Sequence, residues 1–404
     1  MKIGFYGNVN CFPFRYALEL KHQGYEVLFI IDKQPKHKLH RPEYRFSEIS
    51  YPYHDWIQEF IVDKPELKIS FPNIFFKEPI ELLNSCDVVF LNDFAHGIKP
   101  FLKNNILSVS MCSGGDLDFY ARLDLLEQRV VIRKKILKIF TPLKKVLLKK
   151  SILNIRKGIK ESYILHYYFK DIIPSMEKLI DDIKGDNDYI RSMNLGINSE
   201  DVPYYPFIKK DKLMIFNPTR FVWKEPLAEG IQPWSNKRND IMIKGIGLFY
   251  KKHQVELDIH FVEKGADVKE SKQLCDEVGI SHMITWHKEM TQKDIFDFYR
   301  ECDISFDQLG NHFVAYGGLD VMLTGRPVIA NGRPEVLEKV FGKPLPLCQA
   351  TNEKDVAMWI ERLSFENGLK EKIGKESREF VLEYYSMKKT VETYMSYIKK
   401  KLQK

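Results

Sequence analysis

The sequence predicts an α/β protein of two domains, each built around a parallel β-sheet. The first observation is length, because 404 residues exceed one ordinary core and correspond to two domains of roughly 200 residues each. The second is a repeated order of short apolar run, turn, helical pattern and apolar run, which is typical of βαβ units. The third is composition, with 44% hydrophobic and 29% charged residues, as in a folded soluble protein.

The first half gives this order most clearly at its start. Lys2–Tyr6 is a short apolar run that ends in the turn formers Gly7 and Asn8. Phe14–Gln23 has helical spacing and is stopped by Gly24. Strands are predicted at Lys2–Tyr6, Tyr25–Ile31, Asp87–Leu91 and Ile106–Met111.

The second half repeats the order. Strands are predicted at Leu213–Phe216, Leu257–Val262, Met283–Trp286, Asp303–Phe306 and Pro327–Ala330. Pro203 and Pro206 disfavour helix, so we place the boundary near residues 201–210. The predicted domains are residues 1–205 and 206–385. After Leu363 the pattern is helical to the end, and residues 386–404 form a terminal helix.

Cysteine usage and hydropathy indicate a cytoplasmic protein. The six cysteines are scattered without a C-x-x-C pair, which argues against a zinc site or disulfide framework. No apolar run reaches the roughly 18 residues that span a bilayer. The N-terminus enters a strand pattern at once, so it is not interpreted as a signal peptide.

Cations gather in the loop after the first strand of the second half. Parallel sheets bind ligands at the carboxyl ends of their strands, so this position favours a site. The loop contains Arg220, Lys224, Lys237 and Arg238, and a helix is expected to open at Asn239 or Asp240. Convergent cations at a helix N-terminus suit a diphosphate. The alternative is a solvated basic loop.

A second group lies in residues 307–335. Gly310, Gly317 and Gly318 would let the backbone approach a ligand closely. A helix is predicted over Tyr316–Leu323, with Asp320 in its first turns. A carboxylate there suits two ribose hydroxyls, although it also suits the helix dipole alone.

These residues resemble the C-terminal half of family-four glycosyltransferases, which have the GT-B fold. The resemblance covers Arg220 and its following lysine, Asp307-Gln308, and Gly-Gly-x-Asp320-x-Met-x-x-Gly-x-Pro-Val. The family carries two glutamates eight positions apart. Asp320 stands at the second, which implies ribose recognition, and His312 at the first, which implies contact with the transferred sugar. With a reference pKa of ~6.5, a histidine there is expected to change charge with pH.

The resemblance extends more faintly into the first half. Gly7 and Asn8 are similar to the family's acceptor-side glycine loop, and Ser113-Gly-Gly-Asp116 is similar to its H-G-S-D stretch. This implies that Asp116 holds the acceptor or the departing sugar. An ordinary turn aspartate is the alternative.

The resemblance implies two facing Rossmann-like domains with a deep cleft and a C-terminal helix that crosses back to the first domain. It implies a hexosyltransferase that acts with retention and without a metal or other cofactor. The co-substrate would be a nucleoside diphosphate sugar, and the acceptor a saccharide or lipid-linked saccharide in the synthesis of a surface polysaccharide such as lipopolysaccharide or capsule. Asp186-Asn187-Asp188 has the Asp-x-Asp spacing of metal-dependent transferases, but it follows a helical stretch and is interpreted as a solvated turn.

The implied roles are assigned residue by residue. The implied catalytic residues are Arg220, Lys237, Asp116 and His312. The implied donor-binding residues are Arg220, Lys224, Lys237, Tyr316, Gly317, Asp320 and Glu335. The implied acceptor-side residues are Gly7, Asn8, Ser113 and Asp116. Arg220 and Lys237 would stabilise charge that develops on the leaving diphosphate.

One segment holds the excess positive charge. Residues 129–160 contain twelve Lys or Arg and no Asp or Glu, so the net charge of +7 becomes 7 − 12 = −5 for the rest. Apolar residues stand there at helical spacing: Ile132, Ile136, Phe140, Leu143 and Leu147. Pro142 would break or kink this helix. The pattern favours contact with an anionic membrane surface, and a peripheral position on the inner face of the plasma membrane would provide one. The alternative is a helix whose apolar face packs on the first domain. A nucleic acid partner is disfavoured, because Phe140 is the one aromatic residue of the segment that could stack on a base.

Two other functions fit the same observations. A nucleotide-sugar epimerase of the same fold would convert its substrate without an acceptor. A binding or scaffolding protein with a decayed site is suggested by His312 and Ser113, which depart from the family pattern.

Overall fold

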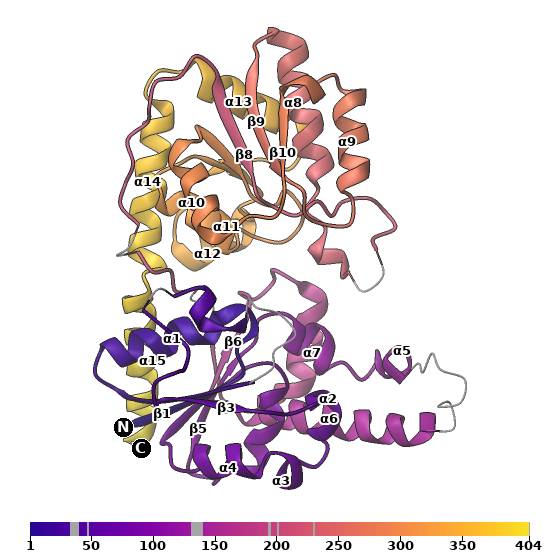
Figure 1. Cartoon of the computed structure of the whole chain (residues 1–404), viewed down its shortest axis with the longest axis vertical. Coiled ribbons are helices and arrows are strands. Elements are labelled where there is room, and N and C mark those ends of the chain that lie inside the picture. Colours follow the sequence, from indigo (N-terminus) through magenta and orange to yellow (C-terminus); the bar gives the residue numbers. More distant parts are fainter. Residues whose placement is uncertain are drawn as a thin grey trace. The chain divides into compact units, whose positions relative to one another are not determined.

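The computed structural model describes residues 1–32, 40–46, 48–130, 140–192, 195–199, 202–228 and 231–403. It divides into two compact units (Figure 1). Unit 1 contains Met1–Lys170, Pro174–Gly196 and Met387–Lys404, and unit 2 contains Asp171–Ile173 and Ile197–Ser386. The division falls at Gly196–Ile197, before the prolines on which the sequence boundary was based.

Unit 1 is built on a parallel sheet of seven described strands in the order β3-β2-β1-β4-β5-β6-β7. The strands are β1 (Lys2–Tyr6), β2 (Glu26–Asp32), β3 (Ile57–Phe60), β4 (Val88–Leu91), β5 (Leu107–Met111), β6 (Ile164–His166) and β7 (Ile190–Ser192). The four predicted strands correspond to β1, β2, β4 and β5. Their inner residues are buried, as expected where both faces of a parallel sheet are covered.

The helices of unit 1 are α1 (Phe12–His22), α2 (Pro65–Lys68), α3 (Pro72–Phe75), α4 (Lys77–Leu83), α5 (Leu126–Val130), α6 (Thr141–Glu161), α7 (Pro174–Lys184) and α15 (Met387–Leu402). Helix α1 starts two residues before its predicted position, and its chain reverses at Gly24, whose φ is +83°. The Asp186–Asp188 stretch follows α7 as an exposed turn, as predicted.

Helix α15 packs against α1 in unit 1, which confirms the predicted C-terminal helix that crosses back to the first domain (Figure 1). The hydroxyl of Tyr394 is hydrogen-bonded to His166 Nδ1 at the end of β6. The Tyr394 ring also stacks on Tyr16 of α1 with centroids 6.0 Å apart. The predicted continuous helix after Leu363 is in fact three helices, with breaks at residues 366–368 and 385–386.

Unit 2 is built on a parallel sheet of six described strands in the order β10-β9-β8-β11-β12-β13. The strands are β8 (Leu213–Asn217), β9 (Leu257–Val262), β10 (Ile284–His287), β11 (Ile304–Phe306), β12 (Val328–Ala330) and β13 (Cys348–Gln349). All five predicted strands are present, and β13 is an addition at the edge.

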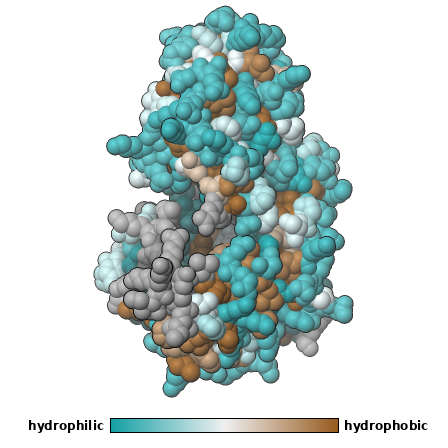
Figure 2. Space-filling model, turned by 90° about the vertical axis from the view of Figure 1, so that its right-hand side faces the viewer, coloured by the Kyte–Doolittle hydropathy of each residue, from teal (hydrophilic) through white to brown (hydrophobic). Residues whose placement is uncertain are grey.

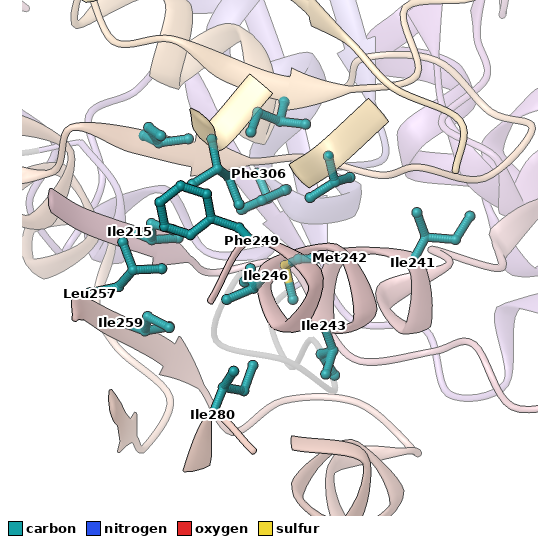
Figure 3. Close-up of a cluster of buried hydrophobic side chains, with 14 of the residues drawn as sticks. Ile215, Ile241, Met242, Ile243, Ile246, Phe249, Leu257, Ile259, Ile280 and Phe306 are labelled. Atoms are coloured by element: carbon teal, nitrogen blue, oxygen red, sulfur yellow. The ribbon is translucent and has the colours of Figure 1, made fainter. Parts of the chain in front are cut away.

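The helices of unit 2 are α8 (Asn239–His253), α9 (Val268–Glu277), α10 (Gln292–Glu301), α11 (Tyr316–Leu323), α12 (Pro334–Phe341), α13 (Glu353–Phe365) and α14 (Leu369–Tyr384). Helix α8 brings Ile243, Ile246 and Phe249 into the main core cluster, beside Ile215 of β8 and Ile259 of β9 (Figure 3). Each such buried side chain contributes about 1.5–3 kcal/mol. This packing fixes the N-terminal end of α8 relative to the strand ends.

Two parts of the basic segment are described, residues 129–130 and 140–160. Ile132 and Ile136 lie outside the described residues, and α6 begins at Thr141. Pro142 therefore stands in the first turn of α6, where its missing N–H is harmless, and it does not kink the helix. Among the described residues, no helix is both long and apolar enough to span a membrane.

Candidate active site

The loops after β8 and β11 in unit 2 are joined by their backbones. Lys237 donates its N–H to Val222 O at 2.7 Å and accepts from Leu309 N at 3.0 Å. A Cβ at Gly310 would lie only 2.1 Å from Asn236 O, so this contact requires glycine. Lys237 is thereby held between the ends of two neighbouring strands, just before α8 opens at Asn239 as predicted.

Two of the four predicted cations are engaged elsewhere. Lys224 forms an ion pair with Glu270 of α9 at 3.2 Å. Arg238 is paired with Asp240 in the first turn of α8 at 3.0 Å. Neither charge is available without breaking a contact, which leaves Arg220 and Lys237 as the cations of this site.

Arg220 and Lys237 form a cation pair that makes no ion pair with the residues described in this loop and its neighbours. Arg220 is exposed and makes no ion pair with any residue that the structure describes. Lys237 is half-buried, and its Nζ donates to Gln308 Oε1. Burial lowers the pKa of Lys237 to about 8; the carboxyl of Asp307 opposes this shift, and the charge of Arg220 adds to it. The region is therefore electrostatically suited to an anion.

Gln308 connects this lysine to His312. Because an ammonium can only donate, Gln308 must present its oxygen to Lys237 and its Nε2 to His312 Nδ1, 3.0 Å away. Burial lowers the pKa of His312 to about 3, and the charge of Lys237 contributes. The expected change of charge near neutral pH is therefore wrong for this conformation, because desolvation keeps the ring neutral.

Asp307 stabilises the loop between β11 and α11. It accepts a hydrogen bond from Ala315 N at 2.9 Å, just before α11. A Cβ at Gly318 would lie 2.6 Å from Asp307 Oδ2, so glycine is needed for this close approach. Burial raises the pKa of the Asp307 carboxyl.

The other predicted donor residues lie around α11 and α12. Tyr316 is the first residue of α11, and a Cβ at the exposed Gly317 would meet only open space. Asp320 is the fifth residue of α11 and lies within its first two turns, as predicted, and its charge adds to burial in raising the pKa of Tyr299. Glu335 is ion-paired with Arg333 at the start of α12.

In unit 1, Asp116 is the centre of a buried hydrogen-bond cluster. Its side chain is 1% exposed. Oδ1 accepts from the backbone N of Asp93 and lies 3.0 Å from His96 Nε2, and Oδ2 accepts from Ser113 N at 2.7 Å. Burial opposes ionisation, but the contacts with His96 and the two backbone amides lower the pKa of Asp116 overall. The carboxylate thus ties the loop after β4 to the loop after β5.

Asn92 adds the loop after β1 to this cluster. Its Oδ1 accepts from Val9 N at 2.9 Å, and its Nδ2 donates to Met111 O at 2.7 Å. A Cβ at Gly7 would lie 2.3 Å from Asn92 O, and Gly7 has a φ of +92°. The predicted acceptor-side residues Gly7, Asn8, Ser113 and Asp116 are therefore gathered at the carboxyl ends of three adjacent strands. The sequence signal for Asn92 was its position directly after a buried strand.

His96, Cys112 and Asp116 bring potential metal ligands within 4.8 Å of one another. Both Asp116 oxygens already accept hydrogen bonds, and burial raises the pKa of the Cys112 thiol well above its ordinary value. Because the Asp116 oxygens join the loops after β4 and β5, we assign this cluster to positioning of the loops.

No protein-family model matches the chain, and no curated protein matches it by sequence. A glycosyltransferase from Rickettsia africae is similar over 100% of this chain and 98% of its own, with 13% identity and a TM-score of 0.60. Sucrose-phosphate synthase from Thermosynechococcus elongatus covers 100% and 99%, with 11% identity and a TM-score of 0.59.

A third similar structure is Anabaena HepE in complex with UDP and glucose, which covers 98% of this chain and 99% of its own, with 11% identity and a TM-score of 0.60. These likenesses extend over both units. The chain therefore has the GT-B fold, and the predicted architecture of two Rossmann-like domains is confirmed.

Proposed function

We propose that this protein is a glycosyltransferase that moves a sugar from a nucleoside diphosphate sugar to a saccharide or lipid-linked saccharide. The observation that carries the proposal is the pair Arg220 and Lys237 at the strand ends of unit 2, with no described ion-pair partner for Arg220. The fold shared with solved glycosyltransferases, one of them bound to UDP and glucose, supports it.

In this proposal the cation pair binds the diphosphate and stabilises the charge that develops on it as the glycosidic bond breaks. Each charge-assisted hydrogen bond contributes about 1.5–3 kcal/mol. The donors are fixed before the reaction, because the Lys237 backbone is bonded to both neighbouring loops. Two cations would perform the task that a metal ion performs in other transferases, so we propose metal-independent transfer.

His312 is proposed to contact the transferred sugar. The resemblance places a glutamate that contacts the sugar at this position, where burial keeps the His312 ring neutral. Asp320 is proposed for ribose recognition, and retention at the anomeric carbon is proposed from the resemblance.

The acceptor is proposed to meet the loops after β1, β4 and β5 of unit 1. Asp116 is only 1% exposed and is bonded to three residues of these loops, so we propose that it positions them rather than touching the acceptor. Gly7, Asn8 and Ser113 are the proposed acceptor-side residues. Surface polysaccharide synthesis at the inner face of the plasma membrane is the proposed setting.

A turnover assay tests this function. The full chain is incubated with a panel of nucleotide sugars and saccharide acceptors in the presence of EDTA, and the products are resolved by NMR. We expect a free nucleoside diphosphate and a glycoside with the anomeric configuration of the donor, and loss of both in Arg220→Ala. An altered nucleotide sugar formed without acceptor would identify an epimerase instead. Nucleotide binding without any turnover would support the scaffolding alternative.

A further inference from the structure

Helix α6 has two apolar faces, and unit 1 uses only one of them. The buried face consists of Leu148, Ile152, Ile155 and Ile159. On the other side, Leu143 is 56% exposed, Val146 63% and Leu153 46%. Positions three or four apart share a helix face, so Leu143, Val146, Lys150 and Leu153 form one outward row. Of the apolar residues that the sequence pattern singled out, Leu143 lies in this row, and packing on unit 1 does not account for its exposure.

Exposed apolar side chains lie at and just before α3, and one of them, Phe71, contacts this outward row. Ile74 is 70% exposed, and Phe71 and Phe75 are 40% and 41% exposed. The Nζ of Lys150 lies 3.8 Å from the centroid of the Phe71 ring. Asn154 of α6 also donates to Ile69 O at 2.9 Å, which fixes the segment that leads into α3. Phe71, Ile74 and Phe75 with Leu143, Val146 and Leu153 are called the α3–α6 surface.

The charge around this surface is strongly positive. Helix α6 carries seven Lys or Arg and one acidic residue, Glu161. Lys149 and Lys150 form no ion pair with any residue in the described part of the chain, whereas Lys145 is paired with Glu127. The N-terminal half of α6 extends beyond the sheet of unit 1 (Figure 1), and the face toward which it points shows apolar atoms among polar ones (Figure 2).

This composition fits a lipid surface better than a protein partner. Lysine is depleted from protein–protein interfaces, whereas lysines beside exposed apolar side chains characterise helices that lie in an anionic membrane interface. Binding of single-stranded nucleic acid would require aromatic side chains that follow one another along a groove. The exposed aromatics here, Phe71 and Phe75, lie only at the α3 end, and the outward row of α6 from Leu143 to Leu153 contains none.

We propose that the α3–α6 surface docks this protein on an anionic lipid surface. The six apolar side chains enter the boundary between headgroups and acyl chains, and Lys149 and Lys150 lie among the lipid phosphates. The proposal deepens the proposed function, on which it rests for the lipid-linked acceptor alone. It adds the residues at α3, which lie outside the basic segment, to the contact.

The test is co-sedimentation of the full chain with phosphatidylcholine vesicles, with or without phosphatidylglycerol, in the absence of nucleotide. We expect binding only with phosphatidylglycerol, and weaker binding as salt rises. Lys149→Glu/Lys150→Glu should weaken binding at least about tenfold. Ile74→Asp and Leu143→Asp/Val146→Asp should each weaken it by about tenfold or more, because burial of these side chains in the interface is lost.

Matched controls come from exposed positions of unit 2. Met358→Asp changes a residue of α13 that is 42% exposed, and Lys251→Glu/Lys354→Glu reverses two exposed lysines. These variants should bind as the wild type does. Every variant is first checked by circular dichroism and by its melting shift with a nucleoside diphosphate. A retained shift with lost vesicle binding separates this surface from the transferase proposal.

Four results would overturn the proposal. The first is no binding of the folded wild type to anionic vesicles, and the second is equal binding to phosphatidylcholine alone. The third is unchanged binding of Ile74→Asp when the lysine reversal abolishes it, because the contact would then belong to the basic segment without α3. Binding to an oligonucleotide in place of vesicles would also contradict it.

Discussion

The two sheets carry polar clusters at corresponding places, the carboxyl ends of their strands, but the clusters differ in how well their groups are satisfied. In unit 1, the Asp116 carboxylate is buried and is bonded on both oxygens. In unit 2, Arg220 is exposed and lies near Lys237, whose pKa its charge helps to lower. Both oxygens of the Asp116 carboxylate have partners, although the buried Nδ1 of His96 in the same cluster has no described hydrogen-bond partner. The cation pair of unit 2 gains from an added anion.

This difference separates residues that hold loops from residues that bind a ligand. A buried polar group with all its partners is costly to disturb, because removal leaves the partners unpaired. A cation pair without a matching anion contributes little to folding and can contribute strongly to binding. Variants in the two clusters should therefore have opposite effects on stability and on nucleotide affinity.

The largest effect is expected from Asp116→Ala. The change leaves His96 and the N–H groups of Asp93 and Ser113 without their acceptor, so unit 1 should lose roughly 3–5 kcal/mol of unfolding free energy. Calorimetry of the full chain measures this as a lower first transition. Since the folded pKa of Asp116 is lowered, its contribution is present above the ordinary pKa of aspartate and is lost as pH falls through the lowered value.

Asp118→Ala is the matched control, since Asp118 is bonded to Tyr167 at 2.8 Å but is not part of the Asp116 cluster. It should destabilise unit 1 by less than Asp116→Ala. Equal losses for both variants would contradict the central position given to Asp116.

The next effect is expected from Arg220→Ala on nucleotide affinity. Loss of one charge-assisted contact should weaken nucleoside diphosphate binding by about 1.5–3 kcal/mol, which titration calorimetry measures directly. Stability should change by less than about 0.5 kcal/mol, because the side chain is exposed. Lys224→Ala is the control, since its ammonium is paired with Glu270. If Lys224→Ala weakened binding more, the assignment of the cation pair would be wrong.

The sequence predicted the strand ends well and the partners of the cations poorly. The strands β8 and β9 were visible because they are short, continuous apolar runs, whereas β7 (Ile190–Ser192) is only half-buried and β13 has two residues. Arg220 and Lys237 were predicted because they follow a strand. That Lys224 turns to Glu270 depends on a contact across 46 positions, which no local pattern contains.

Burial explains the remaining differences. The neutral state of His312 follows from desolvation by residues that packing brings around it, so the reference pKa of the free side chain was a poor guide. Asn92 and His96 were missed because their contacts join loops after different strands. Their position directly after the apolar run of β4 was the available signal.

A smaller effect is expected when the affinity for a nucleoside diphosphate is measured as a function of pH. Lys237 has a pKa of about 8 in the unliganded protein, and a bound diphosphate should raise it. Below about pH 8 the Lys237 side chain is protonated, so it does not limit the affinity for the diphosphate. Above that pH the amine must take up a proton before it can bind the diphosphate as a cation. Affinity should therefore fall by up to about tenfold per pH unit above pH 8 until the raised pKa is reached. Calorimetric titrations measure this slope, and Lys237→Met should abolish it.

The smallest effect is expected on the stability of Lys237→Met. Removal of a half-buried ammonium near Arg220 is favourable, while the unpaired Gln308 Oε1 is unfavourable, so the net change should stay within about 1 kcal/mol. Chemical denaturation measures it. A loss comparable to that of Asp116→Ala would show that Lys237 is mainly structural and would erase the contrast between the two clusters.

The most direct test of the cation pair compares the melting temperature of the wild type with a panel of nucleoside diphosphates and with the matching nucleosides. At about 100 times the dissociation constant, a bound diphosphate should add about 2.7 kcal/mol to the stability of the folded state. We predict that the melting temperature rises with at least one nucleoside diphosphate, does not rise with the matching nucleoside, and no longer rises with the diphosphate in Arg220→Ala. Equal shifts with nucleoside and diphosphate, or no shift with any of them, would contradict it.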